Sequence, residues 1–263
     1  MAVRAVLFDL DDTLVAQDHA DDEALRAAVA LLPTDHIGVA TALIDAVRRQ
    51  ARVQWYEAPT GPYCRAMGIS PLEGMWARFD TPQPPITALA AWAPTYRITT
   101  WRLALEECGV HDPLLPSRML SVFQQTRCRL HVLFPDTLAC LTALQAQYRL
   151  ALITNGAPDL QRTKIAGSGL GEWFEVMIVS GELGIGKPDP RIFMATLERL
   201  RLTPSQAVMV GNSLAHDIEG ARAAGIGSVW INRTGDQPPT TAAPDVVITD
   251  LEVLPALLAA WPG

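Results

Sequence analysis

AVLFDLDDTL, residues 5–14, joins a short apolar run to three acids near the start of this 263-residue chain. A short apolar run that stops at polar residues is typical of a buried strand. Acids that follow such a strand lie at the carboxyl edge of a sheet, where open α/β folds bind their ligands. Two carboxylates two residues apart, here Asp9 and Asp11, can share a hard cation, and one of them can act as a nucleophile. The alternative is an acidic turn in which an Asp caps the following helix.

The composition is that of an ordinary soluble globular protein, with 49% hydrophobic and 19% charged residues. A net charge of −7 argues against nucleic acid or an anionic membrane surface as the main partner. No apolar stretch approaches the roughly 20 residues of a membrane-spanning helix, and no basic leader of a signal peptide precedes the first apolar run. The four cysteines show no CxxC spacing and are expected to be reduced thiols. We therefore expect a cytoplasmic protein with neither a nucleic acid nor a membrane as its partner.

Lysine and asparagine are rare in this chain. Its 21 basic residues include only two lysines, Lys164 and Lys187, and only three asparagines occur, among them Asn155 and Asn212. Each of these can be an ordinary surface residue. In a chain that otherwise avoids these residue types, however, they are worth examining as functional groups.

The pattern of the chain changes about halfway along its length. Residues 18–131 show helical spacing of apolar residues and no convincing strand. After them, short β-branched runs alternate with helical stretches; the runs are 149–153, 176–180, 207–210, 228–231 and 246–248. This alternation predicts an α/β fold with a parallel, Rossmann-like sheet between two helical layers. The first strand needs that sheet to bury both its faces. We therefore expect a core of residues 1–15 and 132–263, with an all-helical domain, residues 16–131, inserted into it.

Three further segments place polar groups where a predicted strand ends. In ITNG, residues 153–156, the Thr154 hydroxyl and nearby N–H groups suit a phosphate, although Asn-Gly is also an ordinary turn. In GKPDP, residues 186–190, a loop lysine can neutralise both a carboxylate and a phosphate, or can simply be solvated. In GNSLAHD, residues 211–217, Asn212 and Asp217 offer oxygens to Mg²⁺, unless Asp217 only interacts with a helix dipole.

The order of these motifs is more specific than any one of them. FDLDDTL (8–14), ITNG (153–156), GKPDP (186–190) and GNSLAHDIEGARAAGI (211–226) follow one another, each at a strand end. In the order of these motifs and their place at strand ends, the chain resembles the haloacid dehalogenase superfamily, most of whose members are Mg²⁺-dependent phosphatases. The resemblance covers the whole core and implies a Rossmann-like sheet with a helical cap inserted directly after the first motif. Within the cap it is a resemblance of layout only.

The resemblance implies a mechanism for hydrolysis of a small phosphorylated metabolite. Asp9 would attack phosphorus and form an aspartyl-phosphate, and Asp11 would protonate the leaving alcohol and then activate water. Thr13 would order the loop that follows the nucleophile. The remaining groups would hold the phosphoryl oxygens or the metal: Thr154, Asn155 and Lys187 for phosphate, and Asp9, the Asp11 carbonyl, Asn212 and Asp217 for Mg²⁺.

One position departs from the commonest pattern of the family. Many relatives carry Asp where this chain has Asn212, so a neutral amide oxygen replaces one anionic ligand. An amide oxygen can still coordinate Mg²⁺ but attracts it less strongly. We therefore predict weaker Mg²⁺ affinity than an Asp variant would have.

Other reactions of the superfamily can be weighed from the residues. A 2-haloacid dehalogenase uses the same nucleophile without a metal and typically lacks the second aspartate of the first motif, so Asp11 disfavours it while Asn212 keeps it open. Phosphonoacetaldehyde hydrolase needs a cap lysine, and residues 16–132 contain none. A phosphomutase similar to β-phosphoglucomutase is disfavoured on the same ground. A catalytically silent family member that serves as a binding protein is the rival from another class.

The resemblance also implies that the cap selects the leaving alcohol. Arg48, Arg49 and Arg52 form a basic cluster on one predicted helix, which can face an anionic substrate or can be a solvated face. The aromatic residues of the inserted segment, such as Trp55 and Tyr96, are expected to form its core.

Overall fold

A computed structural model describes residues 2–235 and 244–261. The chain forms two compact units. The sheet unit comprises Met1–Ala16, Val132–Asn155 and Ser168–Gly263, and the helical unit comprises Gln17–His131 and Gly156–Gly167.

Among its described residues, the sheet unit contains six parallel strands in the order β3-β2-β1-β4-β5-β6. Their bounds are β1 Ala5–Phe8, β2 Arg149–Thr154, β3 Val176–Val179, β4 Ala207–Gly211, β5 Gly227–Ile231 and β6 Val246–Ile248. The last residue of β1, Phe8, pairs with Leu152 on one side and Val210 on the other. The carboxyl ends of β1, β2 and β4 therefore meet at one edge, as the sequence predicts.

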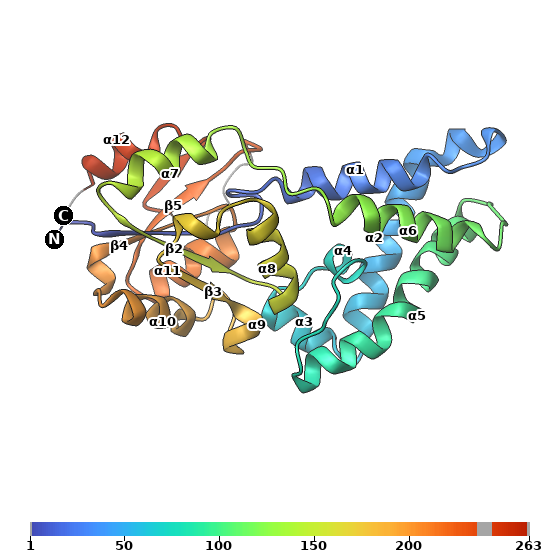
Figure 1. Cartoon of the computed structure of the whole chain (residues 1–263), viewed down its shortest axis with the longest axis horizontal. Coiled ribbons are helices and arrows are strands. Elements are labelled where there is room, and N and C mark those ends of the chain that lie inside the picture. Colours follow the sequence, from blue (N-terminus) through green and yellow to red (C-terminus); the bar gives the residue numbers. More distant parts are fainter. Residues whose placement is uncertain (1, 236–243, 262–263) are drawn as a thin grey trace. The chain divides into compact units, whose positions relative to one another are not determined.

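Helices cover both faces of this sheet. Figure 1 shows α7 (Thr137–Gln145) and α12 (Leu254–Ala259) on one side, and α10 (Pro190–Leu200) and α11 (Glu219–Ala223) on the other. Leu7 and Ile153 belong to the same apolar cluster as Phe193 of α10. Burial on both faces explains why the central strands are continuous apolar runs rather than alternating ones. The predicted three-layer Rossmann-like fold is confirmed.

The helical unit is built from seven α-helices and one 3₁₀ helix within the described residues. They are α1 Gln17–Val29, η1 Thr34–Val39, α2 Ala40–Glu57, α3 Gly61–Met67, α4 Pro71–Gly74, α5 Pro84–Glu107, α6 Leu115–Arg127 and α8 Pro158–Gly167. Helix α1 packs against α6, and α2 packs against α5. Trp55 lies at the centre, with its ring centroid 5.0 Å from that of Tyr96 and its Nε1 donating to the Ile69 carbonyl at 2.9 Å. Both rings are buried, as expected of core residues.

Helix α8 differs from the expected division of the chain, which placed residues 156–167 with the sheet. Ala157 and Leu160 join the apolar core of the helical unit. Lys164 of α8 donates from Nζ to Glu73 Oε1 of α4 at 2.6 Å, and both side chains are buried. This shared core and ion pair attach α8 to the helical unit. Among the helices described, none is both long and apolar enough to cross a membrane.

Candidate active site

The sheet topology brings the predicted site residues of the sheet unit to one edge. Asp9 follows β1, Thr154 ends β2 and Asn212 follows β4. Lys187 lies in the loop before α10, and Asp217 lies in the short helix Leu214–Ile218. The Asp9 N–H donates to the Val210 carbonyl at 3.0 Å, which extends the pairing of β1 and β4 by one residue. The backbone of the nucleophile candidate is therefore fixed by the sheet itself.

Lys187 forms the centre of a buried charge cluster. Its Nζ donates to Asp9 Oδ1 at 2.5 Å, to Asp217 Oδ1 at 2.7 Å and to the Ile153 carbonyl at 2.9 Å. All three charged side chains are nearly inaccessible to solvent. An ammonium group with three acceptors is fully hydrogen-bonded, which is what makes a buried charge tolerable. Both lysines of the chain thus lie in buried ion pairs rather than on the surface.

The electrostatics of this cluster leave it with excess negative charge. Burial raises the pKa of Asp9, the charge of Lys187 opposes that shift, and the nearby Asp217 and Asp11 carboxylates reinforce it, so the pKa lies at about 7. For Lys187, burial acts to lower the pKa, but the attraction of Asp217 and Asp9 outweighs burial and the pKa is raised. The lysine therefore stays charged, and a further cation at this edge would favour the ionised form of Asp9.

Thr13 holds the second oxygen of Asp9. The Thr13 hydroxyl is fully buried, donates to Asp9 Oδ2 at 3.1 Å and accepts from the Asn212 N–H at 3.1 Å. The Asn212 carbonyl in turn accepts from Trp230 Nε1 at 2.8 Å. Thr13 therefore links the loop that follows β1 to Asn212, which follows β4. The contribution of Trp230 was not predicted, because an aromatic residue within an apolar strand carries no motif.

Asp217 reaches the strand end because Gly211 has no side chain. A Cβ at Gly211 would lie only 2.3 Å from Asp217 Cγ, well inside van der Waals contact. The other carboxylate oxygen, Oδ2, accepts from the Ser213 N–H at 2.9 Å. The carboxylate is thus fixed at both oxygens, one by Lys187 and one by backbone.

Asn155 acts on Lys187 through its side-chain amide. Its Nδ2 donates to the Lys187 carbonyl at 2.9 Å, and its Oδ1 accepts from the Lys187 N–H at 2.8 Å. This pair of hydrogen bonds fixes the lysine loop against the end of β2. The Asn155 side chain therefore positions the backbone of Lys187.

The oxygen donors at this edge fit Mg²⁺. Asp9 and Asp217 present carboxylates on either side of one ammonium group, and Asn212 Oδ1 lies 3.5 Å from the Thr13 hydroxyl. Carboxylate, amide and carbonyl oxygens are the ligands that this hard cation prefers, with water completing the shell. Within residues 2–235 and 244–261, no three or more His, Cys, Asp and Glu side chains are grouped as a metal site. A cation here would accordingly depend on two carboxylates and neutral oxygens.

The basic cluster of the helical unit is largely used in ion pairs. Arg48 pairs with Asp22 and Arg49 pairs with Glu107, and these groups are partly exposed. The guanidinium of Arg52 lies over the Tyr56 ring. These contacts favour the interpretation of the cluster as a solvated, ion-paired face.

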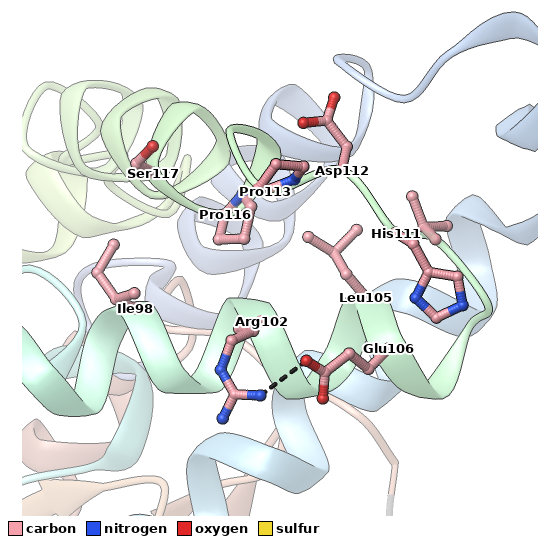
Figure 2. A pocket seen from close by; sticks show the side chains of 10 residues that line it. Ile98, Arg102, Leu105, Glu106, His111, Asp112, Pro113, Pro116 and Ser117 are labelled. Carbon is pink, nitrogen blue, oxygen red and sulfur yellow. Dashed lines mark hydrogen bonds and ion pairs between the residues drawn. The ribbon is translucent and has the colours of Figure 1, made fainter.

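A separate cavity of about 380 Å³ opens between α5 and α6 of the helical unit. Figure 2 shows apolar side chains such as Ile98 and Leu105 in its lining, together with the Arg102–Glu106 ion pair, whose closest atoms are 2.7 Å apart. None of the predicted catalytic, phosphate or metal residues lines it. The candidate site is therefore the strand edge rather than this cavity.

Comparison with known proteins identifies a matching family and a similar relative. Residues 3–225 match the family model described as haloacid dehalogenase-like hydrolase. The chain is 39% identical over 255 residues to a phosphoserine phosphatase of Thermus thermophilus, covering 95% of this chain and 96% of the relative.

Solved structures show the same fold. One solved structure is that of the HAD (haloacid dehalogenase) hydrolase YfnB of Bacillus subtilis bound to magnesium. It is 23% identical to this chain with a TM-score of 0.68, and the match covers 98% of this chain and 99% of that one. A 2-haloacid dehalogenase of Pseudomonas syringae pv. Tomato is 28% identical with a TM-score of 0.60, covering 99% of this chain and 100% of that one.

Proposed function

Because the chain belongs to the haloacid dehalogenase-like hydrolase family, we propose that it is a Mg²⁺-dependent phosphatase that hydrolyses a small phosphate monoester through an aspartyl-phosphate. The observation that carries this proposal is the Asp9 carboxylate held at both oxygens, one by Lys187 and one by Thr13. A nucleophile fixed in this way needs no reorganisation before attack. Asp11 stands two residues further along the same loop, where a second carboxylate can serve as acid and base.

In this proposal, Asp9 and Asp11 carry out the two steps of the reaction. One oxygen of Asp9 forms a bond to phosphorus as the bond from phosphorus to the alcohol oxygen breaks, and Asp11 gives its proton to that oxygen. In the second step Asp11 takes a proton from water, whose oxygen attacks phosphorus and releases Asp9. The charge of Lys187 and the hydroxyl of Thr154 offset the phosphoryl charge in both steps. Backbone N–H groups at Leu10 and Asn155 supply further donors.

Mg²⁺ would be held by the side chains of Asp9, Asn212 and Asp217 and by the carbonyl of Asp11. When bound, the ion offsets the negative charge that separates an anionic carboxylate from an anionic phosphate. The neutral Asn212 supports the expectation of weaker affinity than with an aspartate. The raised pKa of Asp9 is consistent with a site arranged to accept one more cation.

Phosphate-ester hydrolysis is favoured over dehalogenation by Asp11. In the dehalogenase reaction no alcohol leaves, so the Asp11 carboxylate would have no alcohol to protonate. The phosphoserine phosphatase relative, at 39% identity over nearly the whole chain, supports the same choice and makes phosphoserine the first substrate to test. We further propose that the helical unit supplies the groups that select the alcohol.

A single set of assays tests the proposal. Purified protein is offered p-nitrophenyl phosphate and phosphoserine with MgCl₂ or EDTA, with Asp9→Asn as the control. We expect release of phosphate that requires Mg²⁺ and is lost in Asp9→Asn. Halide released from 2-chloropropionate in EDTA would instead establish the dehalogenase. No turnover on a broad panel of phosphate esters and haloacids would favour the silent binding protein.

A further inference from the structure

Arg233 lies beside the catalytic loop although no motif contains it. Its Nη1 and Nη2 donate to the two carboxylate oxygens of Asp136 at 2.9 and 3.0 Å, and its Cζ lies 3.8 Å from the centroid of the Phe134 ring. Asp136 also accepts from the Leu251 N–H at 2.8 Å. A bidentate guanidinium stacked on an aromatic ring is a rigid arrangement that lysine cannot reproduce.

From this position Arg233 reaches the backbone of the catalytic loop. Its Nη2 donates to the Thr13 carbonyl at 2.9 Å. The next carbonyl, that of Leu14, accepts from the Phe134 N–H and from Thr137 Oγ1, each at 3.0 Å. Two consecutive carbonyls of the loop are therefore held by the segment 134–137 and by the arginine that this segment binds.

The loop transmits this restraint because it is tightly closed. The N–H groups of Leu14 and Val15 both donate to the Leu10 carbonyl, and the Asp12 N–H donates to the Val15 carbonyl at 2.7 Å. Asp12 has a φ of 55°, which a non-glycine residue adopts only where its surroundings impose it. In a loop closed in this way, the Thr13 carbonyl and the Thr13 hydroxyl have little freedom to move independently of each other.

We propose that Arg233 is a positioning residue for the nucleophile, acting on Asp9 through Thr13. Its guanidinium holds the Thr13 carbonyl, and the hydroxyl of the same residue holds Asp9 Oδ2. Arg233 is thus two hydrogen bonds away from the nucleophile and is itself oriented by Asp136. The effect of Arg233 on kcat rests on the proposed function, whereas its effect on the structure of the loop does not.

Arg149 provides a matched control in the same unit. It too forms a bidentate ion pair, with Glu175, and donates to a backbone carbonyl, that of Leu200. It stands at the start of β2, whereas the catalytic groups follow the strand ends. Replacement of Arg149 therefore removes the same kinds of contact without touching the catalytic loop.

The experiment compares Arg233→Ala, Arg233→Lys and Arg149→Ala with the wild type. We expect Arg233→Ala to lose about 10²-fold in kcat with KM nearly unchanged, because a misplaced nucleophile costs rate while the substrate contacts remain. Arg233→Lys should lose part of this, and added guanidinium should restore part of the rate of Arg233→Ala. Arg149→Ala should keep the wild-type kcat and should not respond to guanidinium.

Amide hydrogen exchange supplies a readout that needs no activity. In Arg233→Ala the N–H groups of Leu14 and Val15 should exchange faster than in the wild type and in Arg149→Ala. If Arg233→Ala does not fold, Arg233→Lys and Asp136→Asn carry the same comparison. Unchanged loop exchange and unchanged kcat in a folded Arg233 variant would overturn the inference. A wild type without phosphatase activity would instead overturn the proposed function, and the exchange data would still decide the role of Arg233.

Discussion

Replacement of Lys187 by methionine removes the charge at the centre of the site while keeping a flexible side chain of similar length. The Nζ that is lost donates to Asp9, Asp217 and the Ile153 carbonyl. Methionine offers none of these three hydrogen bonds. The variant therefore leaves two buried carboxylates facing each other without their shared counter-charge.

The size of the effect follows from the distances. The two accepting oxygens lie 2.5 and 2.7 Å from Nζ, and removing one partner of a buried ion pair held this closely costs about 3–5 kcal/mol, because the remaining charge is left uncompensated. We expect the metal-free Lys187→Met protein at pH 8 to lose about that much free energy of unfolding. Loss of the positive charge from the phosphoryl site should also lower kcat by about 10²–10³-fold.

The assay combines urea unfolding in EDTA with p-nitrophenyl phosphate kinetics in MgCl₂. Lys164→Met is the matched control, because it makes the same change at the other lysine, which is equally buried and ion-paired. We expect Lys164→Met to lose stability while keeping kcat within the order of magnitude of the wild type. A Lys187→Met protein with wild-type unfolding free energy and wild-type kcat would refute the role assigned to this lysine.

Three further outcomes are expected. Asn212→Asp should lower the Mg²⁺ concentration for half-maximal activity by about tenfold, because affinity rises with the number of charged ligands; a Mg²⁺ titration showing unchanged or weaker affinity would contradict this. Burial acts to raise the pKa of Asp136, but hydrogen bonds from Arg233 and the Leu251 N–H outweigh it and the pKa lies below its ordinary value. The stability from this carboxylate is therefore present above the unfolded-state pKa and lost as the pH falls through the lower folded-state value. Asp136→Asn should thus cost about 2 kcal/mol at pH 7 and progressively less towards pH 3, measured by urea unfolding; a difference independent of pH would count against the ion pair. Lys164→Met should cost about 3–5 kcal/mol because Glu73 is left buried and unpaired, and adding Glu73→Gln should recover most of that loss; a double variant no more stable than the single one would contradict the pairing.

The parts of the fold that sequence alone could predict are those set by local patterns. Short apolar runs that end in polar groups indicated parallel strands, and their shared edge placed Asp9, Lys187 and Asp217 near one another. The structure confirms the sheet and shows Lys187 in direct contact with both Asp9 and Asp217. The scarcity of lysine was also informative, because both lysines are buried ion-pair partners.

What sequence could not predict depends on contacts between distant, common residue types. Arg233 is one of 19 arginines, and its link to Thr13 spans 220 positions. Trp230 sits in an apolar strand, where nothing marks its indole N–H as a hydrogen-bond donor to Asn212. The packing of α8 with the helical unit depends on the shape of that unit's core, which periodicity does not report. Each of these contacts forms only when distant parts of the chain are brought together by folding.

The proposed function requires that Asp9 becomes phosphorylated during turnover. The most direct measurement is to quench the enzyme with acid during hydrolysis of p-nitrophenyl phosphate, reduce the acyl-phosphate with borohydride and locate the product by mass spectrometry. Reduction converts a phosphorylated aspartate to homoserine. We predict homoserine at position 9 in the wild type and at no position in Asp9→Asn, which should be inactive. Hydrolysis that continues in Asp9→Asn, or homoserine at another aspartate, would contradict the claim.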